Sequence, residues 1–140
     1  MKVEIEESGS MDLAAELTRV NMLSYYKSRN ITWDPEKYVQ TWLEFENFDV
    51  KYQGQWVGVL RFSSDENALY LRDIQIDSKY QKLGIGAQCL KYALDRAKSL
   101  ALSRLRLLVF SENPALNLYK KFGFKSVGES NGLIKMELIV

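Results

Sequence analysis

Several short segments of the chain alternate apolar and polar residues, and this pattern predicts β-strands. Val3 and Ile5 lie between charged residues in the segment from Lys2 to Glu6, as expected for a strand near the edge of a sheet. Further strands are expected at residues 48–52, 55–62, 68–76, 104–109, 125–127 and 133–139, with a hairpin at Gly54 and turns at residues 63–67 and 128–132.

Other segments repeat apolar residues at helical spacing. A first helix is expected to begin at Ser10 and run to about Lys27. A second is expected from Asp34-Pro35 to about Phe45, because aspartate caps a helix and proline suits its first position. The apolar positions of the first helix are Leu13, Ala14, Leu17, Val20 and Leu23. A third helix is expected at residues 83–102, and a fourth is expected after Asn113.

The resulting order is β-α-α-β-β-β-α-β-α-β-β, which predicts a mixed β-sheet flanked by helices, of the α+β or α/β class. The strand at residues 68–76, the long helix and the strand at residues 104–109 should form a crossover that joins two parallel strands. With 140 residues and no linker, the chain is expected to form one domain over residues 1–140.

Charge and hydropathy narrow the range of partners. Lysine and arginine number 19 against 18 acidic residues, so we expect neither nucleic acid nor a membrane as a partner. The chain has no apolar run of membrane-spanning length, and residues 1–11 are too acidic for a signal peptide. A cytoplasmic protein is therefore expected.

The chain has one cysteine and no histidine, which excludes an internal disulfide, a Ser-His-Asp triad and a histidine-ligated metal site. We expect no metal. Cys89 shares a four-residue spacing with Ile85, Ala93 and Ala97, which favours packing in the core over a nucleophilic role. Any acid or base must then be a carboxylate, a tyrosine, a lysine, water or the backbone.

The segment Gln81-Lys82-Leu83-Gly84-Ile85-Gly86 lies between an apolar strand and an amphipathic helix. Glycines allow close approach of the backbone, and the first turn of a helix offers unpaired N–H groups, so this loop suits a pyrophosphate. It lacks the Walker pattern and the third glycine or alanine of a dinucleotide fingerprint, which would fall at Cys89. A helix that merely starts with glycines is the alternative.

This loop resembles the Gln/Arg-x-x-Gly-x-Gly/Ala motif of the GNAT superfamily of N-acetyltransferases. The segment from Asn113 to Phe124 resembles the second signature of that family, with Asn113 and Pro114 opening a short helix, Tyr119 within it and Gly123 closing it. The two motifs follow in the expected order, and the resemblance covers residues 67–128 well.

The resemblance implies acetyl-CoA as cofactor and a fold in which two parallel strands splay apart around the pantetheine arm. It implies that Tyr119 donates a proton to the leaving thiolate, and that Asn113 contacts the cofactor near its pantetheine end. Pantetheine would pair with main-chain groups of Ile74, Gln75 and Ile76, and the diphosphate would bind at Gln81, Lys82, Leu83, Gly84, Ile85, Gly86 and Ala87. Nearby lysines that either meet an anionic cofactor or form a solvated face are Lys79, Lys82, Lys91, Lys120 and Lys121.

The general base is where the sequence departs from the family. Arg72 occupies one commonly acidic position, which leaves Asp73 beside it as a candidate base or as one partner of a salt bridge. A water relay to Glu44, Glu46 or Asp49 is another route. Aromatic residues that could line an acceptor pocket, although most are expected in the core, are Tyr25, Tyr26, Trp33, Tyr38, Trp42, Phe45 and Phe48; Trp33 is expected to be partly exposed.

These features favour an N-acetyltransferase that moves an acetyl group from acetyl-CoA directly to an amine, in a small molecule or a protein. A catalytically silent coenzyme A-binding sensor or interaction module is the second reading. A nucleotide-binding regulatory domain is disfavoured, because no acidic ribose ligand follows the glycines. The acceptor and the pathway stay open, and the strand from Leu133 to Ile139 is a candidate edge for a homodimer.

Overall fold

The computed structural model describes residues 2–140; Met1, which belongs to the segment considered above for a signal peptide, lies outside the described residues. The described chain is built on a seven-stranded sheet of order β1-β2-β3-β4-β5-β7-β6. The strands are β1 (Val3–Glu7), β2 (Glu46–Tyr52), β3 (Gln55–Ser64), β4 (Ala68–Ile76), β5 (Arg104–Phe110), β6 (Lys125–Ser130) and β7 (Leu133–Ile139); the helices are α1 (Met11–Ser28), α2 (Pro35–Glu44), the 3-10 turn η1 (Ser78–Tyr80), α3 (Ile85–Ser99) and α4 (Ala115–Phe122). The predicted order and the mixed sheet are confirmed.

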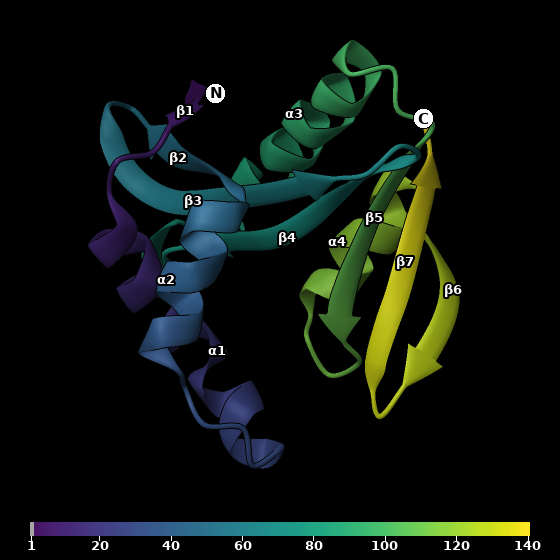
Figure 1. Ribbon diagram of the computed structural model, residues 1–140. Helices are drawn as coiled ribbons and strands as arrows, with labels where there is room; N and C mark the ends of the chain where they lie inside the picture. Colours follow the sequence, from purple (N-terminus) through teal and green to yellow (C-terminus); the bar gives the residue numbers. More distant parts are fainter. Residues whose placement is uncertain (1) are drawn as a thin grey trace.

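The sheet divides between its two central strands. All neighbouring strands are antiparallel except β4 and β5, which run parallel. Their pairing extends only from Ala68 opposite Arg104 to Leu71 opposite Leu107, although β4 continues to Ile76 and β5 to Phe110. Beyond that point the strands diverge (Figure 1), so the predicted splay of the parallel strands is confirmed.

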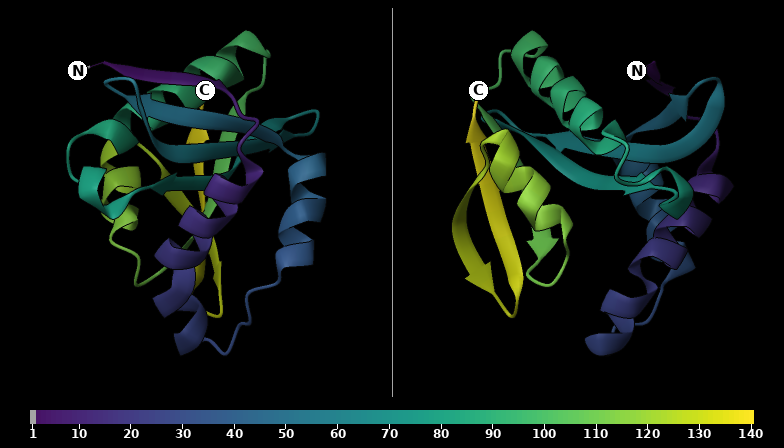
Figure 2. Two further views of the ribbon diagram at one scale, coloured as in Figure 1. Left: turned by 90° about the vertical axis from the view of Figure 1, so that its left-hand side faces the viewer. Right: turned by 180° about the vertical axis from the view of Figure 1, so that it is seen from behind.

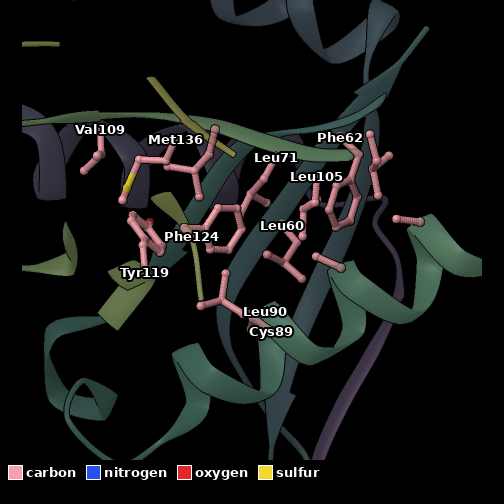
Figure 3. Close-up of a cluster of buried hydrophobic side chains, with 14 of the residues drawn as sticks. Leu60, Phe62, Leu71, Cys89, Leu90, Leu105, Val109, Tyr119, Phe124 and Met136 are labelled. Atoms are coloured by element: carbon pink, nitrogen blue, oxygen red, sulfur yellow. The ribbon is translucent and has the colours of Figure 1, made fainter. Parts of the chain in front are cut away.

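Helices α3 and α4 cover one face of the sheet, and α1 and α2 lie on the other, as the rear view in Figure 2 shows. The larger core lies under α3 and α4 and includes Leu60, Leu71, Cys89 and Met136 (Figure 3). The smaller core under α1 and α2 centres on Ala14, Tyr38 and Val59. The alternation within β3 explains this division, because Val59 and Leu60 point to opposite faces.

Two local expectations were wrong. β7 is paired with β5 on one side and with β6 on the other, so Leu133–Ile139 is an interior strand and does not offer a free edge for a homodimer. The hairpin that joins β6 and β7 turns at Asn131 and Gly132, both with positive φ, so β6 extends further than the sequence suggested.

Of the predicted apolar positions of α1, only Ala14 is fully buried. Leu13 and Val20 are 52% and 54% exposed, whereas Ala14 and Thr18 are buried. The helix turns polar groups to the sheet because it crosses the open part of β4, where Asn21 donates to main-chain and side-chain acceptors. Ser10 stands at the N-cap of α1 but its side chain makes no capping bond.

Candidate functional site

The loop before α3 presents free hydrogen-bond donors. Lys82 and Gly84 have φ of 63° and 89°, so the chain turns twice into the left-handed region before the helix begins. Among the described residues, the backbone N–H groups of residues 82–87 have no hydrogen-bond acceptor, whereas Gln88 already donates to Gly84. Together with the positive end of the helix dipole, these donors form a site for an anion.

A cavity of about 480 Å³ adjoins this loop. It runs from the loop along the free edge of β4 to the start of α4 and the middle of α1. Of the five lysines considered above, only Lys82 lines it. The predicted cofactor residues that line it are Ile74, Gln75, Ile76, Gln81, Lys82, Gly84, Gly86, Ala87 and Asn113, together with Tyr119; Leu83 and Ile85 do not.

The free edge of β4 offers main-chain groups to this cavity. The Asp77 N–H donates to the Val57 carbonyl, so these two residues form a hydrogen-bonded pair of the antiparallel ladder. In such a ladder every second pair is hydrogen-bonded, and the next such pair is Gln75 opposite Val59. The main chain of Gln75 is therefore turned to β3, which corrects its expected pairing with pantetheine. Ile74 and Ile76 instead face the gap left by β5, and the Ile76 carbonyl accepts from Asn21 at 3.0 Å and from Gln81 at 2.9 Å.

Asn113 lies where α4 begins. Its Oδ1 accepts from the Ala115 N–H at 2.9 Å, so the side chain caps the helix as predicted even though the regular helix begins at Ala115. The cap leaves the Asn113 amide group free to face both cavities, since Asn113 lines each of them.

A second cavity, of about 170 Å³, lies on the other side of the gap between β4 and β5. It shares Met22, Ile74, Gln75, Asn113 and Tyr119 with the first cavity, so the two spaces meet where the strands diverge. Its other walls are Tyr26 of α1, residues 71–73 of β4, residues 107–110 of β5, and Leu133.

Tyr119 stands at this meeting point. Its ring packs edge-on against Phe124, with centroids 6.0 Å apart, at the border of the core shown in Figure 3. Burial and the charge of Asp73 raise the pKa of the Tyr119 phenol, so the hydroxyl stays protonated across the neutral range. Its hydroxyl has no hydrogen-bond partner among the described residues, and Tyr119 lines both cavities, as a residue that donates a proton between two substrates must.

Asp73 lines the second cavity and forms the salt bridge that the sequence suggested. Its Oδ2 accepts from Arg61 at 3.1 Å and its Oδ1 from Gln75 at 3.2 Å. Burial raises the pKa of the Asp73 carboxyl, while the charge of Arg61 opposes that rise. The carboxylate is therefore held in place, and it is more basic than the carboxylate of a solvent-exposed aspartate.

Arg61 is the residue that sequence reasoning missed. It is only 2% exposed, donates to Asn47 Oδ1 at 3.1 Å and to Thr41 Oγ1 at 2.6 Å, and its guanidinium lies 4.3 Å from the Tyr38 ring centroid. Arg61 is a single charged residue inside the apolar run from Val57 to Phe62. Because a buried charge needs a partner, this pattern could have indicated a buried ion pair.

The other candidate carboxylates lie elsewhere. Glu46 pairs with Arg96, Asp49 accepts from Ser8 Oγ and Trp56 Nε1, and Glu44 is exposed. None of the three lines either cavity, so only a relay through water could connect them to the site.

The N-terminal aromatic residues divide between site and core. Tyr25 lines the first cavity and Tyr26 the second. Trp33 is partly exposed, as predicted, but it packs between Tyr26 and Tyr38 and lines neither cavity. The rings of Tyr38, Trp42 and Phe45 surround the Arg61 guanidinium. Phe48 lies in the larger core.

Cys89 is buried against the sheet, and burial raises the pKa of its thiol to about 12. We expect the folded protein to resist a thiol-specific reagent at pH 8, because almost no thiolate is present, and to react once denaturant is added. Cys89→Ala should cost little activity. Rapid modification of the native thiol, or an acetyl group trapped on Cys89 after mixing with acetyl-CoA, would contradict this assignment.

Across residues 2–140, no group of three or more acidic or cysteine side chains is placed to hold a metal ion. Within the same residues, none of the helices is both long and apolar enough to cross a membrane.

The sequence pattern that describes the acetyltransferase (GNAT) family matches residues 14–124. Solved structures with the same fold include a GNAT family acetyltransferase from Elizabethkingia anophelis with acetyl-CoA bound (19% identity, TM-score 0.78, covering 99% of this chain and 98% of the other). The PaiA N-acetyltransferase from Thermoplasma acidophilum in complex with coenzyme A is 18% identical (TM-score 0.79, complete coverage of both chains). The ribosomal-protein-S18-alanine N-acetyltransferase from Escherichia coli is 20% identical (TM-score 0.75, 99% and 94% coverage).

Proposed function

The chain belongs to the acetyltransferase (GNAT) family, and from that premise we propose that it transfers the acetyl group of acetyl-CoA directly to an amine. One observation carries the proposal: a cavity that begins at free N–H groups and a second cavity share Tyr119 as a lining residue, in the gap between β4 and β5. Such a meeting point allows both substrates to be present at once, so no covalent enzyme is needed. We further propose that residues 1–140 act as a single acetyltransferase domain.

The first cavity would take acetyl-CoA. The N–H groups of residues 82–87 and the Lys82 ammonium would hold the diphosphate, and Asn113 would contact the pantetheine end. The main-chain N–H and C=O groups of Ile74 and the N–H group of Ile76, which β5 leaves unpaired, would bond to the pantetheine amides, whereas the Ile76 carbonyl is already bonded to Asn21 and Gln81. Structural neighbours with acetyl-CoA and coenzyme A bound support this assignment.

The second cavity would take the amine. An alkylamine with a pKa near 10.4 is mostly protonated at neutral pH, so its attack requires loss of a proton. Among the residues that the structure describes, Asp73 is the one carboxylate that lines either cavity, and it is our candidate for the base. Tyr119 would donate its proton to the leaving thiolate, and a main-chain N–H of β4 would polarise the carbonyl. A neighbour named for an alanine acceptor supports an amine here.

The alternative function is a catalytically silent coenzyme A binder that acts as a sensor or interaction module. The observation that favours it is the engagement of Asp73 by both Arg61 and Gln75, which leaves that carboxylate few free lone pairs. Under this alternative the first cavity would still bind its ligand, while the second would support no chemistry.

A thiol-release assay over a panel of amines and peptides, run beside a titration with coenzyme A, separates the two functions. Tight binding together with amine-dependent thiol release supports the transferase. Tight binding with no release above the hydrolysis rate for any amine supports the silent binder, and absence of binding contradicts both.

Asp73→Asn should lower kcat/KM by at least about tenfold for an alkylamine, because a positioned base is lost. For an acceptor of low pKa, such as hydroxylamine, the loss should be much smaller, since that amine is already neutral. The matched control is Asp95→Asn on the exposed side of α3. An equal loss for both amines would indicate that Asp73 only holds Arg61 and is not the base; thermal unfolding reports on that structural part.

A further inference from the structure

A β-bulge in β4 places two oppositely charged side chains side by side. Arg61 pairs with Asp73 and Phe62 pairs with Leu71, so Arg72 is an extra residue without a partner on β3. The bulge interrupts the usual alternation of side chains between the two faces of the sheet. Asp73 bonds to Arg61 on the α1–α2 side of the sheet, and the Arg72 guanidinium lies 5.6 Å from the ring centroid of Phe45, at the end of α2. Both side chains therefore face the second cavity, which both line.

Arg72 is positioned but not neutralised. Its Nε donates to Ser63 Oγ at 2.7 Å, and its guanidinium lies 4.6 Å from the Tyr70 ring centroid. Within residues 2–140, neither of its terminal nitrogens donates a hydrogen bond and no carboxylate lies within salt-bridge distance. By contrast, Arg61 pairs with Asp73, while Arg104 and Arg106 both pair with Glu137. The two terminal nitrogens of this guanidinium are free, and one N–H from each can match the two oxygens of a carboxylate.

The second cavity continues past Arg72 into an open groove of about 470 Å³ on the same face of the sheet. The two spaces share Leu71, Arg72, Leu107 and Leu108, so Arg72 stands at their border. The charged residues of the groove beyond it are Arg106, Lys135 and Glu137. Glu137 is bound by two arginines, and the groove therefore keeps an excess of positive charge.

We propose that Arg72 is a specificity residue that binds a carboxylate of the acceptor, so that the acceptors are amines carrying a carboxylate a few bonds from the nitrogen. The proposal rests on the transferase function proposed above. The amine enters the second cavity beside Asp73 and Tyr119, and the acceptor's carboxylate meets the Arg72 guanidinium at the cavity mouth. The carboxylate belongs either to a free amino acid or to an acidic side chain of a peptide that extends into the groove.

The test compares pairs of acceptors that differ in one carboxylate: Gly-Glu with Gly-Gln for a peptide, and glycine with glycinamide for a free amino acid. Initial rates of thiol release are measured for the wild type, for Arg72→Gln, and for Arg19→Gln. Arg19 of α1 is partly exposed, pairs with Glu16 and lines neither cavity, so it is the matched arginine control.

For each pair we compare kcat/KM for the acid with kcat/KM for the amide. In Arg72→Gln this ratio should fall by about tenfold or more for at least one pair, because hydrogen bonds to a charged group are lost. The change should come from a higher KM for the acid. The ratio should be unchanged in Arg19→Gln. The pair that responds identifies the source of the carboxylate. A ratio that is the same in wild type and Arg72→Gln for both pairs overturns the proposal, even if amine acetylation itself is robust.

Binding gives a readout that does not depend on turnover. In the presence of coenzyme A, N-acetylglycine should bind more tightly to wild type than N-acetylglycinamide does, and Arg72→Gln should remove that difference. The same comparison is made for N-acetyl-Gly-Glu and N-acetyl-Gly-Gln, and equal affinities within both pairs in wild type would contradict the assignment of Arg72. Failure of every amine to release thiol, with this difference intact, would overturn the transferase function while supporting the carboxylate site.

Discussion

Replacing Gly84 with aspartate is expected to abolish binding of coenzyme A, with affinity at least about a hundredfold weaker, because several hydrogen bonds to a charged group would be lost. Gly84 has φ of 89°, a conformation that L side chains resist, and it is the N-cap of α3. A carboxylate there would also repel the diphosphate that the N–H groups of residues 82–87 are proposed to hold. Isothermal titration with coenzyme A measures the effect.

Two further variants separate charge from structure. Gly9→Asp is the matched control, because a Cβ at Gly9 would meet no atom within 4 Å and the residue lies in neither cavity. Gly84→Ala adds the backbone strain without the charge and should weaken binding less. Coenzyme A affinity at the wild-type level in folded Gly84→Asp would remove the loop from the cofactor site.

Gly86→Glu should abolish binding as well, but it tests the loop less cleanly. A Cβ at this position would lie 3.0 Å from Leu118 Cδ2, so the substitution also presses α3 against α4. Its thermal unfolding temperature must be measured beside the titration, because a fall in stability would account for part of the lost affinity.

Tyr119→Phe is expected to lower kcat by about 10²-fold or more, the contribution of a positioned general acid, while leaving coenzyme A affinity nearly intact. The ring would still pack against Phe124, and only a hydroxyl without a protein partner would be removed. Single-turnover measurement of thiol release gives the chemical step directly.

Tyr92→Phe is the matched control for this variant. Tyr92 packs against Phe48 and Phe62 in the larger core and lines neither cavity, so its hydroxyl should not matter for turnover. A wild-type chemical rate in Tyr119→Phe would make water the proton donor and Tyr119 a structural residue. A loss of activity that follows a loss of folded protein would show that the hydroxyl stabilises the fold instead.

Features set by neighbouring residues could be predicted from the sequence. Asp34 caps α2 through the Glu36 and Lys37 N–H groups, and Gly123 closes α4 with φ of 119°. The turn at Gly84 and the buried stripe through Cys89 are local in the same sense. The turn before α3 and the order of the elements could therefore be predicted, because each depends on a few consecutive residues.

Features set by pairing across the sheet could not be predicted from the sequence. The bulge at Arg72 depends on the register between β3 and β4, and the burial of Arg61 depends on aromatic residues of α2 that lie far away in sequence. The stripe on α1 marked an apolar face, but periodicity cannot say whether another element covers it, and Val20 is more than half exposed. The interior position of β7 likewise follows from a pairing with β6 that its own sequence does not reveal.

Initial-rate kinetics with acetyl-CoA and an acceptor amine varied together test direct transfer in the gap between β4 and β5. Because the two cavities meet at Tyr119, both substrates should bind before any product leaves, and double-reciprocal plots should intersect. Parallel lines, with release of coenzyme A before the amine binds, would require an acetyl-enzyme and would contradict direct transfer.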